Sequence, residues 1–552
     1  MADATLEAAA WVELTPEQSS ELIRRSSPMA VRPGDVLFRS GDPHYDFFYI
    51  ESGHVEIVRE ATPDSAAEIV TEHGAGRFLG ELSLLTGQAA YLTARVTQEG
   101  RVHRLSQEGF RQLMADNAEL SDLILHTLVA RRLRLQAGTA ARSIEILGTS
   151  LSAASHGLRT WAARQQLPHV WLEYESPEGQ TLATALSATT ADLPLVVTPT
   201  AVLRRATAGD LAENIGLSYQ AVPGSEHDLV VVGAGPGGLA AAVYGASEGL
   251  DTMLLDAVSV GGQAAASSRI ENYLGFPFGL TGELLASRAE LQAHKFGARV
   301  SSPCEVRSLR AADGHLRLTL PDGTEVVSHA VVIATGARYR ELPLERWSDF
   351  LGAGIYYAAT ELEARECRPH PVVVVGGGNS AGQASLYLAD HGSHVHLLLR
   401  GDDLTANMSQ YLVDRVLAHP NIDVLLSTEI TALHGDTHLE RITVHTRTTG
   451  ASSTSACHGL FCFVGAVPAT AWLTDVALDK DGFVLTDRDL DDVDLSPAWE
   501  LLGRRPLPFE TSVPGVFAVG DVRYGSMKRV AAAVGEGASA VRSVHQAITP
   551  GH

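Results

Sequence analysis

The stretch that decides the fold is HDLVVVGAGPGGLAAAVYGASEGLDTMLLDA, residues 227–257. An apolar run leads into a glycine-rich turn and a helix of small residues, and a second apolar run ends at the acidic residue Asp256. Gly233 allows the tight turn, Gly235 lets the backbone approach a pyrophosphate, and Gly238 lets the helix pack closely on a strand. Asp256 can hold a ribose hydroxyl. The stretch therefore predicts a βαβ unit of a parallel sheet that binds a dinucleotide.

A second stretch of the same kind, PVVVVGGGNSAGQASLYLADHGSHVHLLLR, begins at Pro371. Its second apolar run ends at Arg400, where an acid would hold the ribose of NADH and a cation accommodates the extra phosphate of NADPH. NADPH is therefore favoured, with NADH as the alternative. The residues expected to contact NAD(P)H are Gly376, Gly378, Asn379, Ser380, Ala381 and Arg400.

Four further motifs follow the first turn in order, GGQ at 261–263, IENYLGFP at 270–277, VVIATGA at 331–337 and PGVFAVGDV at 514–522. With that turn they resemble the flavin domain of low-molecular-weight thioredoxin reductases. The resemblance places Gln263 and Asn272 near the flavin and Asp521 on its ribityl chain. It also places the start of a helix after Lys528 along the flavin ring edge, where helix-end amides stabilise the charge of reduced flavin.

This resemblance covers residues 225–548 and implies FAD and NAD(P)H as cofactors and a homodimer as the assembly. The residues that it implies for FAD are Gly233, Gly235, Gly238, Asp256, Gly262, Gln263, Asn272, Ala334, Thr335, Gly336, Gly520, Asp521, Arg529, Val530 and Ala531.

One departure from the reductases concerns their redox cysteines. In that family the nicotinamide-binding insert opens with a tyrosine or serine followed by C-A-T-C. Here IYYAATELEA puts Ala358, Ala359, Thr360 and Glu361 on those positions, so both sulfurs are absent. Hydride transfer from nicotinamide to flavin needs no protein sulfur, whereas thiol exchange with thioredoxin needs a thiolate. The sequence thus predicts reduction of the flavin and argues against literal thioredoxin reduction.

Three hypotheses for function follow. The first is an NAD(P)H-dependent flavoenzyme that passes electrons directly to a quinone, a small disulfide, oxygen or a protein carrier. The second is a disulfide reductase with a single thiol, for which Cys367 is the candidate, and the alternative for that residue is a structural cysteine. The third is a redox or nucleotide sensor whose flavin state alters partner binding.

The N-terminal part has a different pattern. Residues 29–58, MAVRPGDVLFRSGDPHYDFFYIESGHVEIV, read as short strands separated by glycines and predict a small β-roll. The GELSLL that follows at 80–85 resembles the phosphate cassette of cyclic-nucleotide-binding domains. The contacts implied for a nucleotide are Gly80, Glu81 and Leu82, of which Glu81 would accept a ribose hydroxyl.

The cassette lacks the arginine that would neutralise the cyclic phosphate. Ala89, Ala90 and Tyr91 occupy that region, and Arg95 comes several residues late. A phosphate without its cation loses a strong charge-assisted contact. Both readings stay open, a cyclic-nucleotide site and a fold retained for packing or dimerisation.

Residues 142–217 alternate short strands and helices in an order that resembles a thioredoxin or glutaredoxin-like domain, with Pro194 at the position of that family's cis-proline. The redox motif would lie in GTSLSAAS, residues 148–155, which has no cysteine. This part is therefore expected to be a redox-inactive adaptor.

The fold class expected is a multidomain α/β chain with two Rossmann-type domains of three layers, preceded by a β-roll and a small thioredoxin-like domain. The expected bounds are 1–140 for the cyclic-nucleotide-binding-like domain, 141–220 for the thioredoxin-like domain, 225–343 and 466–548 for the FAD domain, and 344–465 for the NAD(P)H domain.

Composition narrows the partners. The net charge of −23 over 552 residues argues against nucleic acid and anionic membrane surfaces as partners. The N-terminal residues show no basic and apolar targeting pattern, so a cytoplasmic location is expected. The four cysteines form no C-x-x-C and no metal-ligand spacing, so no metal is expected.

Overall fold

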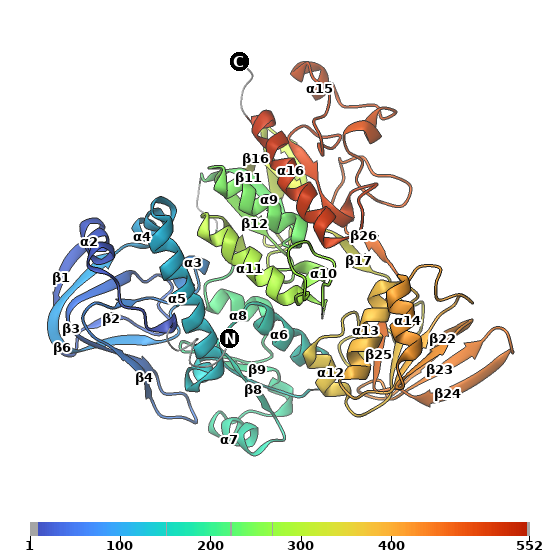
Figure 1. The fold of residues 1–552 in the computed structure, drawn as a ribbon, viewed down its shortest axis with the longest axis horizontal. Helices are drawn as coiled ribbons and strands as arrows, with labels where there is room; N and C mark the ends of the chain where they lie inside the picture. The colour runs from blue at the N-terminus through green and yellow to red at the C-terminus, as the bar shows by residue number, and fades with distance from the viewer. Residues whose placement is uncertain (1–8, 151, 221–223, 268, 549–552) are drawn as a thin grey trace. The chain divides into compact units, whose positions relative to one another are not determined.

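The computed structural model describes residues 9–150, 152–220, 224–267 and 269–548 (Figure 1). The prediction that the N-terminus carries no targeting pattern rests partly on the first eight residues, which lie outside the described residues. Leu151, in the loop where a redox motif would lie, is also outside them. The chain forms two compact units. One comprises Met1–Thr149, Leu158–Gln220 and Gln292–Pro303, and the other Ser150–Gly157, Ala221–Leu291 and Cys304–His552.

The N-terminal β-roll has six strands in the order β1-β6-β3-β4, with β2 paired to β6 and β5 paired to β3. Its core includes Phe47, whose ring stacks on Phe78 and Phe110 with centroids 5.2 and 5.0 Å apart. The elements are α2 Pro16–Arg25, β1 Ser27–Val31, β2 Val36–Phe38, β3 Phe47–Arg59, β4 Glu68–His73, β5 Phe78–Leu79, α3 Ser83–Thr86, β6 Thr93–Leu105, α4 Gln107–Asp116, α5 Ala118–Ala137 and η1 Thr139–Ser143.

A four-stranded sheet with the order β10-β9-β7-β8 follows, in which β7 pairs parallel with β8 and antiparallel with β9. The peptide bond before Pro194 is cis. Helix α7 was not predicted from the sequence. The elements are β7 Glu145–Gly148, α6 Ala153–Arg164, β8 Val170–Glu173, α7 Pro177–Ala185, η2 Thr190–Asp192, β9 Leu195–Val197, β10 Val202–Leu203 and α8 Ala208–Asn214.

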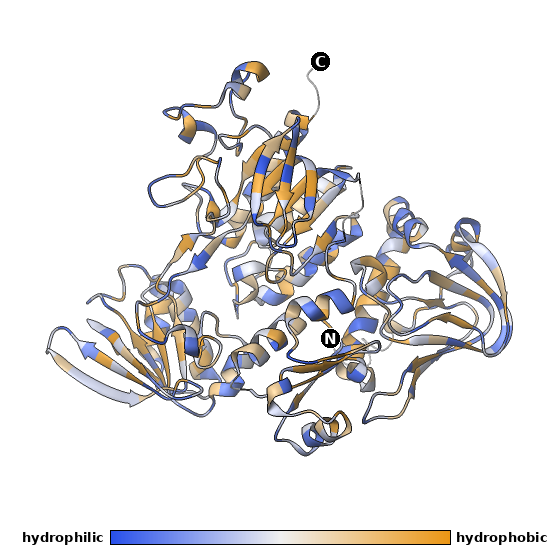
Figure 2. Ribbon diagram, turned by 180° about the vertical axis from the view of Figure 1, so that it is seen from behind, coloured by the Kyte–Doolittle hydropathy of each residue, from blue (hydrophilic) through white to orange (hydrophobic). Residues whose placement is uncertain are grey.

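The first glycine turn belongs to a seven-stranded sheet with the order β13-β12-β11-β16-β15-β14, and β27 pairs with β16. Strands β12, β11, β16 and β27 run parallel and are largely hydrophobic (Figure 2). The elements are β11 Glu226–Val232, α9 Pro236–Ser247, β12 Thr252–Leu255, α10 Gly262–Ala265, α11 Gly282–Lys295, β13 Arg299–Ser301, β14 Ser308–Ala312, β15 His315–Thr319, β16 Glu325–Ile333, η4 Asp487–Leu490, α15 Pro497–Leu502, β27 Val516–Ala518, η5 Gly520–Val522 and α16 Val530–Ile548.

The second glycine turn belongs to a parallel five-stranded sheet with the order β18-β25-β19-β20-β21, beside a three-stranded sheet β22-β23-β24. A two-stranded sheet of β17 and β26 joins this insert to the chain on either side. The elements are β17 Ala337–Tyr339, η3 Ser348–Phe350, β18 Ile355–Tyr356, α12 Glu361–Cys367, β19 Val372–Val375, α13 Asn379–Asp390, β20 Val395–Leu398, α14 Gln410–Ala418, β21 Ile422–Leu425, β22 Thr428–His434, β23 Arg441–Thr446, β24 Ala451–Ala456, β25 Gly459–Cys462 and β26 Ala466–Pro468.

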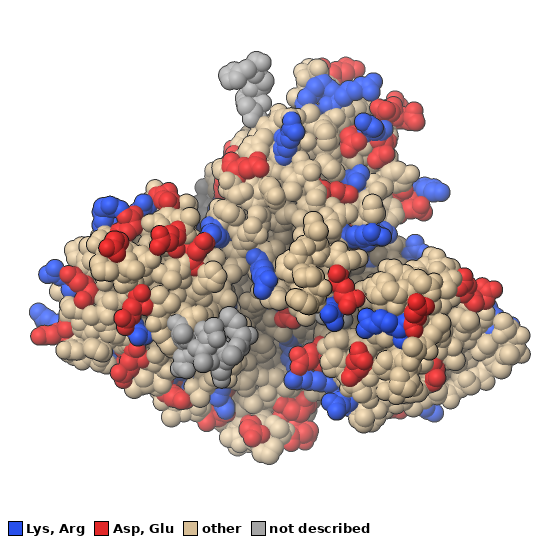
Figure 3. Space-filling view, viewed as in Figure 1, with Lys and Arg blue, Asp and Glu red and all other residues tan. Residues whose placement is uncertain are grey.

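These sheets and helices confirm the predicted multidomain α/β class. Within the described parts of the chain, no helix is both long enough and apolar enough to span a membrane. On the face drawn in Figure 3, acidic and basic side chains are intermixed over the described residues.

Helices α9 and α16 approach each other through glycines, although they lie far apart in the sequence (Figure 1). A methyl group on Gly537 of α16 would lie 2.1 Å from the carbonyl oxygen of Gly237 in α9. That distance is far inside van der Waals contact, so only glycine permits this helix spacing.

We predict that Gly537→Ala lowers the midpoint of thermal unfolding followed by circular dichroism, because overpacking costs about 1–3 kcal/mol. Gly535→Ala is the matched control in the same helix, since no atom lies within 4 Å of a methyl group built there. That control is expected to stabilise by about 0.5–1 kcal/mol, because alanine favours a helix interior. Equal midpoints for the two variants would contradict the glycine-mediated contact.

Candidate functional site

Two glycines of the first turn, Gly233 and Gly238, leave no room for a side chain. Gly233 has a φ of 106°, and a methyl group there would lie 2.3 Å from the carbonyl oxygen of Ala334. A methyl group on Gly238 would lie 1.8 Å from the carbonyl oxygen of Gly233. By contrast, no atom lies within 4 Å of a methyl group built on Gly235. The turn is therefore closed on the protein side and open beside Gly235.

This open side coincides with the N-terminus of helix α9. Gly235 is the N-cap residue and no side chain caps the helix. Amides in the first turn of a helix have no partner within the helix and favour an anion. The turn therefore fits the pyrophosphate of a dinucleotide.

Asp256 fixes the same turn from the end of β12. One of its carboxylate oxygens accepts the amide of Ala234 at 2.7 Å. The other accepts the amides of Val258 and Ser259 at 2.8 and 2.9 Å. The carboxylate therefore lies beside the turn, and its contact with a ribose stays a prediction.

Six further residues expected near FAD come from three separate segments. Gly262 and Gln263 begin α10, and the amide of the Gln263 side chain donates to the carbonyl of Ala337. Thr335 follows β16, and its hydroxyl donates to the carbonyl of Ala469 at 2.9 Å. Asn272 is exposed in the loop between α10 and α11. Ala334 and Gly336 flank Thr335 in the loop that ends β16.

Asp521 lies in η5, close to the start of α16. Burial raises the pKa of its carboxyl above the ordinary value, Lys528 opposes this rise and Glu536 adds to it. Glu536 also accepts the amide of Gly520 at 2.7 Å and a guanidinium N–H of Arg523 at 2.8 Å, so it holds this segment in place.

Helix α16 begins at Val530, directly after Arg529. Arg529 and Ala531 are exposed and Val530 is half-buried, so this end of the helix is open to a ligand.

The second glycine turn has the same construction as the first. Gly376 has a φ of 144°, and a methyl group there would lie 2.4 Å from the carbonyl oxygen of Phe463. Gly378 is the N-cap of α13 and no side chain caps that helix. The side chain of Asn379 accepts the amide of Ser409 at 2.7 Å, Ser380 is exposed, and Ala381 is fully buried. The turn therefore fits a second pyrophosphate.

Arg400 follows β20 at the edge of this site and is exposed. The structure adds a second cation there, because the guanidinium of Arg447 donates to the carbonyl of Arg400. Arg447 lies between β23 and β24, and nothing in the local sequence linked it to Arg400.

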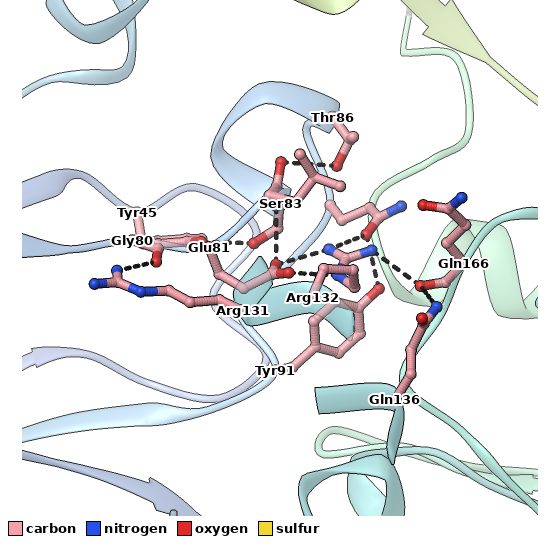
Figure 4. A network of polar contacts seen from close by, with 12 residues as sticks. Tyr45, Gly80, Glu81, Ser83, Thr86, Tyr91, Arg131, Arg132, Gln136 and Gln166 are labelled. Atoms are coloured by element: carbon pink, nitrogen blue, oxygen red, sulfur yellow. Dashed lines mark hydrogen bonds and ion pairs between the residues drawn. The ribbon is translucent and has the colours of Figure 1, made fainter. Parts of the chain in front are cut away.

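In the β-roll cassette, the guanidinium of Arg132 in α5 donates hydrogen bonds to the carboxylate of Glu81 (Figure 4). The carboxylate is therefore already paired within the protein. Arg132 is buried and Glu81 is half-buried, and one Arg132 nitrogen lies 2.7 Å from a Glu81 oxygen. Burial would raise the pKa of Glu81, but Arg132 and hydrogen bonds from Ser83 outweigh it and hold the pKa below its ordinary value. Gly80 and Leu82 flank the pair, and Arg95 pairs elsewhere with Glu56. Sequence reasoning did not predict Arg132 here.

Comparison with known proteins shows which family the chain belongs to. The profile of the family described as "Pyridine nucleotide-disulphide oxidoreductase" matches residues 227–537. The chain belongs to this family. A separate profile, "Cyclic nucleotide-binding domain", matches residues 28–117.

Individual relatives agree with the family. A thioredoxin reductase of Treponema pallidum is 32% identical over 319 residues, which cover 58% of this chain and 96% of the relative. The solved thioredoxin reductase of Lactococcus lactis is 26% identical with a TM-score of 0.51, and covers 58% of this chain and 99% of its own. The solved thioredoxin reductase of T. acidophilum is 29% identical with a TM-score of 0.51. The match covers 58% of this chain and 98% of that one.

The chain is thus an FAD-dependent NAD(P)H oxidoreductase of the pyridine nucleotide-disulphide oxidoreductase family, with a cyclic-nucleotide-binding-type β-roll at its N-terminal side.

The segment where thioredoxin reductases carry their two cysteines joins β18 to α12. The amide of Thr360 donates to the Glu363 carboxylate at 2.8 Å and its hydroxyl donates to the same carboxylate, so Glu363 in the first turn fixes the start of α12. Ala359 is buried, with 4% of its surface exposed. These hydrogen bonds and core packing thus occupy this segment of the chain.

All four cysteines are buried and free. Burial raises the pKa of the Cys304, Cys457 and Cys462 thiols to about 12. Burial also raises the pKa of Cys367, which packs with Val372 in the core of the insert and lies 3.9 Å from the carbonyl oxygen of His458. None of these thiols is a ready thiolate at neutral pH.

We predict that Arg447→Ala raises the KM for NADPH about tenfold and leaves the KM for NADH unchanged, since one charge-assisted contact to the extra phosphate is lost. Arg441→Ala is the matched control, because Arg441 is exposed at the other end of β23. Steady-state kinetics with both coenzymes measures the change. Equal changes for the two coenzymes would contradict a role for Arg447 at the phosphate.

Proposed function

We propose that this chain is an NADPH-dependent flavin oxidoreductase that delivers electrons to an external acceptor without a protein dithiol. The observation that carries the proposal is the segment from Ala358 to Glu361, which holds no sulfur where the related reductases are expected to hold two. FAD, when bound, would take a hydride from NADPH and give an electron pair to the acceptor.

Two features of the chain would hold the coenzymes. The uncapped N-termini of α9 and α13, at Gly235 and Gly378, would bind the two pyrophosphates. Arg400 and Arg447 would bind the phosphate that distinguishes NADPH from NADH.

The start of α16 would act on the flavin itself. Its first-turn amides, which begin at Val530, would face the ring edge and stabilise negative charge there. The charge of Arg529, directly before the helix, adds to this effect.

The proposal keeps the domain bounds and the homodimer predicted from the sequence. The FAD domain at 225–343 and 466–548 is supported by the parallel pairing of β27 with β16 and by the packing of α16 on α9. The insert at 344–465 is supported by its own parallel sheet.

The alternative with a single catalytic thiol is disfavoured by the position of Cys367. Only 1% of its surface is exposed, and a methyl group on Gly459 would lie 2.5 Å from its sulfur. A disulfide substrate needs access to a thiolate, and this sulfur offers neither access nor a low pKa.

The test has two steps on the FAD-loaded protein. Anaerobic mixing with NADPH is expected to bleach the flavin absorbance band, and a quinone such as menadione is then expected to restore it and to turn over. Cys367→Ser is expected to retain turnover within about twofold, because no thiol takes part.

Cys457→Ser is the matched control, because Cys457 is equally buried in the same insert. A loss of turnover in Cys367→Ser alone would overturn the proposal in favour of the single-thiol reductase. Failure of NADPH to bleach bound flavin would overturn the enzyme itself.

A further inference from the structure

The β-roll contains a partly open cavity of about 180 Å³, and all the residues that line it belong to the first compact unit. Most of its wall is apolar and comes from the strands, the cassette and α5. The apolar lining includes Phe38, Ile57, Leu79, Ala90, Leu92 and Leu135. Glu81 and Tyr91 of the cassette region also line it, so it is the space in which a cyclic nucleotide would be sought.

The volume limits the occupant. Pockets for drug-sized ligands measure roughly 300–1,000 Å³, whereas an apolar cavity of about 150 Å³ holds benzene. A cavity of about 180 Å³ therefore holds a compound of one or two rings between its walls.

Three charged side chains line the cavity, Glu81, Arg131 and Arg134, and each already has a contact within the protein. The guanidinium of Arg134 lies over the ring of Trp11, 5.3 Å from its centroid. Arg131 donates to the backbone carbonyls of Ala10, Phe78 and Gly80 at 3.1, 3.1 and 2.8 Å. The carboxylate of Glu81 is held by Arg132, as described above. A charged ligand that recruited Arg131 or Glu81 would have to break a buried interaction, which is costly.

Several uncharged polar side chains line this space, among them Tyr45, Thr71 and His73. His73 lines the cavity, has 3% of its surface exposed, and lies edge-on to the ring of Trp11 at 5.3 Å. Its Nδ1 has no hydrogen-bond partner among the described residues. Burial, with Arg131 and Arg77 nearby, lowers the pKa of His73 to about 3, so the ring is neutral at pH 7. A buried unsatisfied nitrogen of this kind is stabilised by a ligand hydroxyl or carbonyl.

We propose that this cavity binds an uncharged, mostly apolar compound of one or two rings that carries one hydroxyl or carbonyl group, in place of a cyclic nucleotide. The ring system would fill the apolar wall and the polar group would meet His73. The inference concerns the β-roll alone and does not depend on the electron-transfer function proposed above.

The test is isothermal titration of the full-length, FAD-loaded protein with 1-naphthol, and separately with 1-naphthoate and cyclic AMP. We expect 1-naphthol to bind, and 1-naphthoate and cyclic AMP to bind at least tenfold more weakly. Val70→Trp fills the cavity from β4 and is expected to weaken 1-naphthol binding at least tenfold. Ile69→Trp is the matched control, because Ile69 is the next residue along β4 and is 53% exposed.

His73→Phe provides a second variant that removes the polar atom and keeps an aromatic ring. It is expected to weaken 1-naphthol binding about fivefold and to leave naphthalene binding unchanged. The proposal is overturned if cyclic AMP or 1-naphthoate binds as tightly as 1-naphthol, or if wild-type protein binds no 1-naphthol. It is also overturned if Val70→Trp and Ile69→Trp bind equally.

Discussion

Both nucleotide sites depend on one steric constraint, the contact of a glycine with a carbonyl oxygen from a neighbouring strand end. Gly233 meets Ala334 and Gly376 meets Phe463 at distances that exclude any side chain. Each contact holds the strand-to-helix turn against the sheet. As a result the N-terminus of α9 or α13 stands uncapped at the edge of the sheet, where an anion can bind. The same use of glycine brings α16 against α9 and so positions the helix expected behind the flavin.

Burial of the cysteines and of Ala359 distinguishes this chain from a reductase that uses a dithiol. In the segment that aligns with the two cysteines of the reductases, Thr360 is held by the carboxylate of Glu363 and Ala359 is packed in the core. The remaining thiols lie in cores where their pKa values are raised. The chain is an FAD-dependent NAD(P)H oxidoreductase whose described thiols are poorly suited to relay electrons through sulfur. In the β-roll, Arg132 neutralises the carboxylate of Glu81 in the cassette, so this carboxylate is not free to bind a ligand.

The fold could be predicted from the sequence to the extent that it rests on local patterns. The glycine turns, the apolar strands and the small residues of α9 and α13 are all visible in short windows. Helix α7 was missed because its sequence, PEGQTLATA, has few large apolar residues. The pairs Arg400 with Arg447 and Glu81 with Arg132 could not be predicted, because each joins residues that only the fold brings together. The individual FAD, NADPH and nucleotide contacts stay predictions.

In the proposed function, FAD is the one redox group of the protein, and it passes electrons directly to the external acceptor. The most direct measurement is an anaerobic titration of the FAD-loaded protein with dithionite, in which the electrons consumed are counted against flavin absorbance. The account predicts complete bleaching after about one electron pair per FAD, because only the flavin is reduced. Consumption of about two pairs per FAD, as a flavin together with a redox-active disulfide would require, would contradict it.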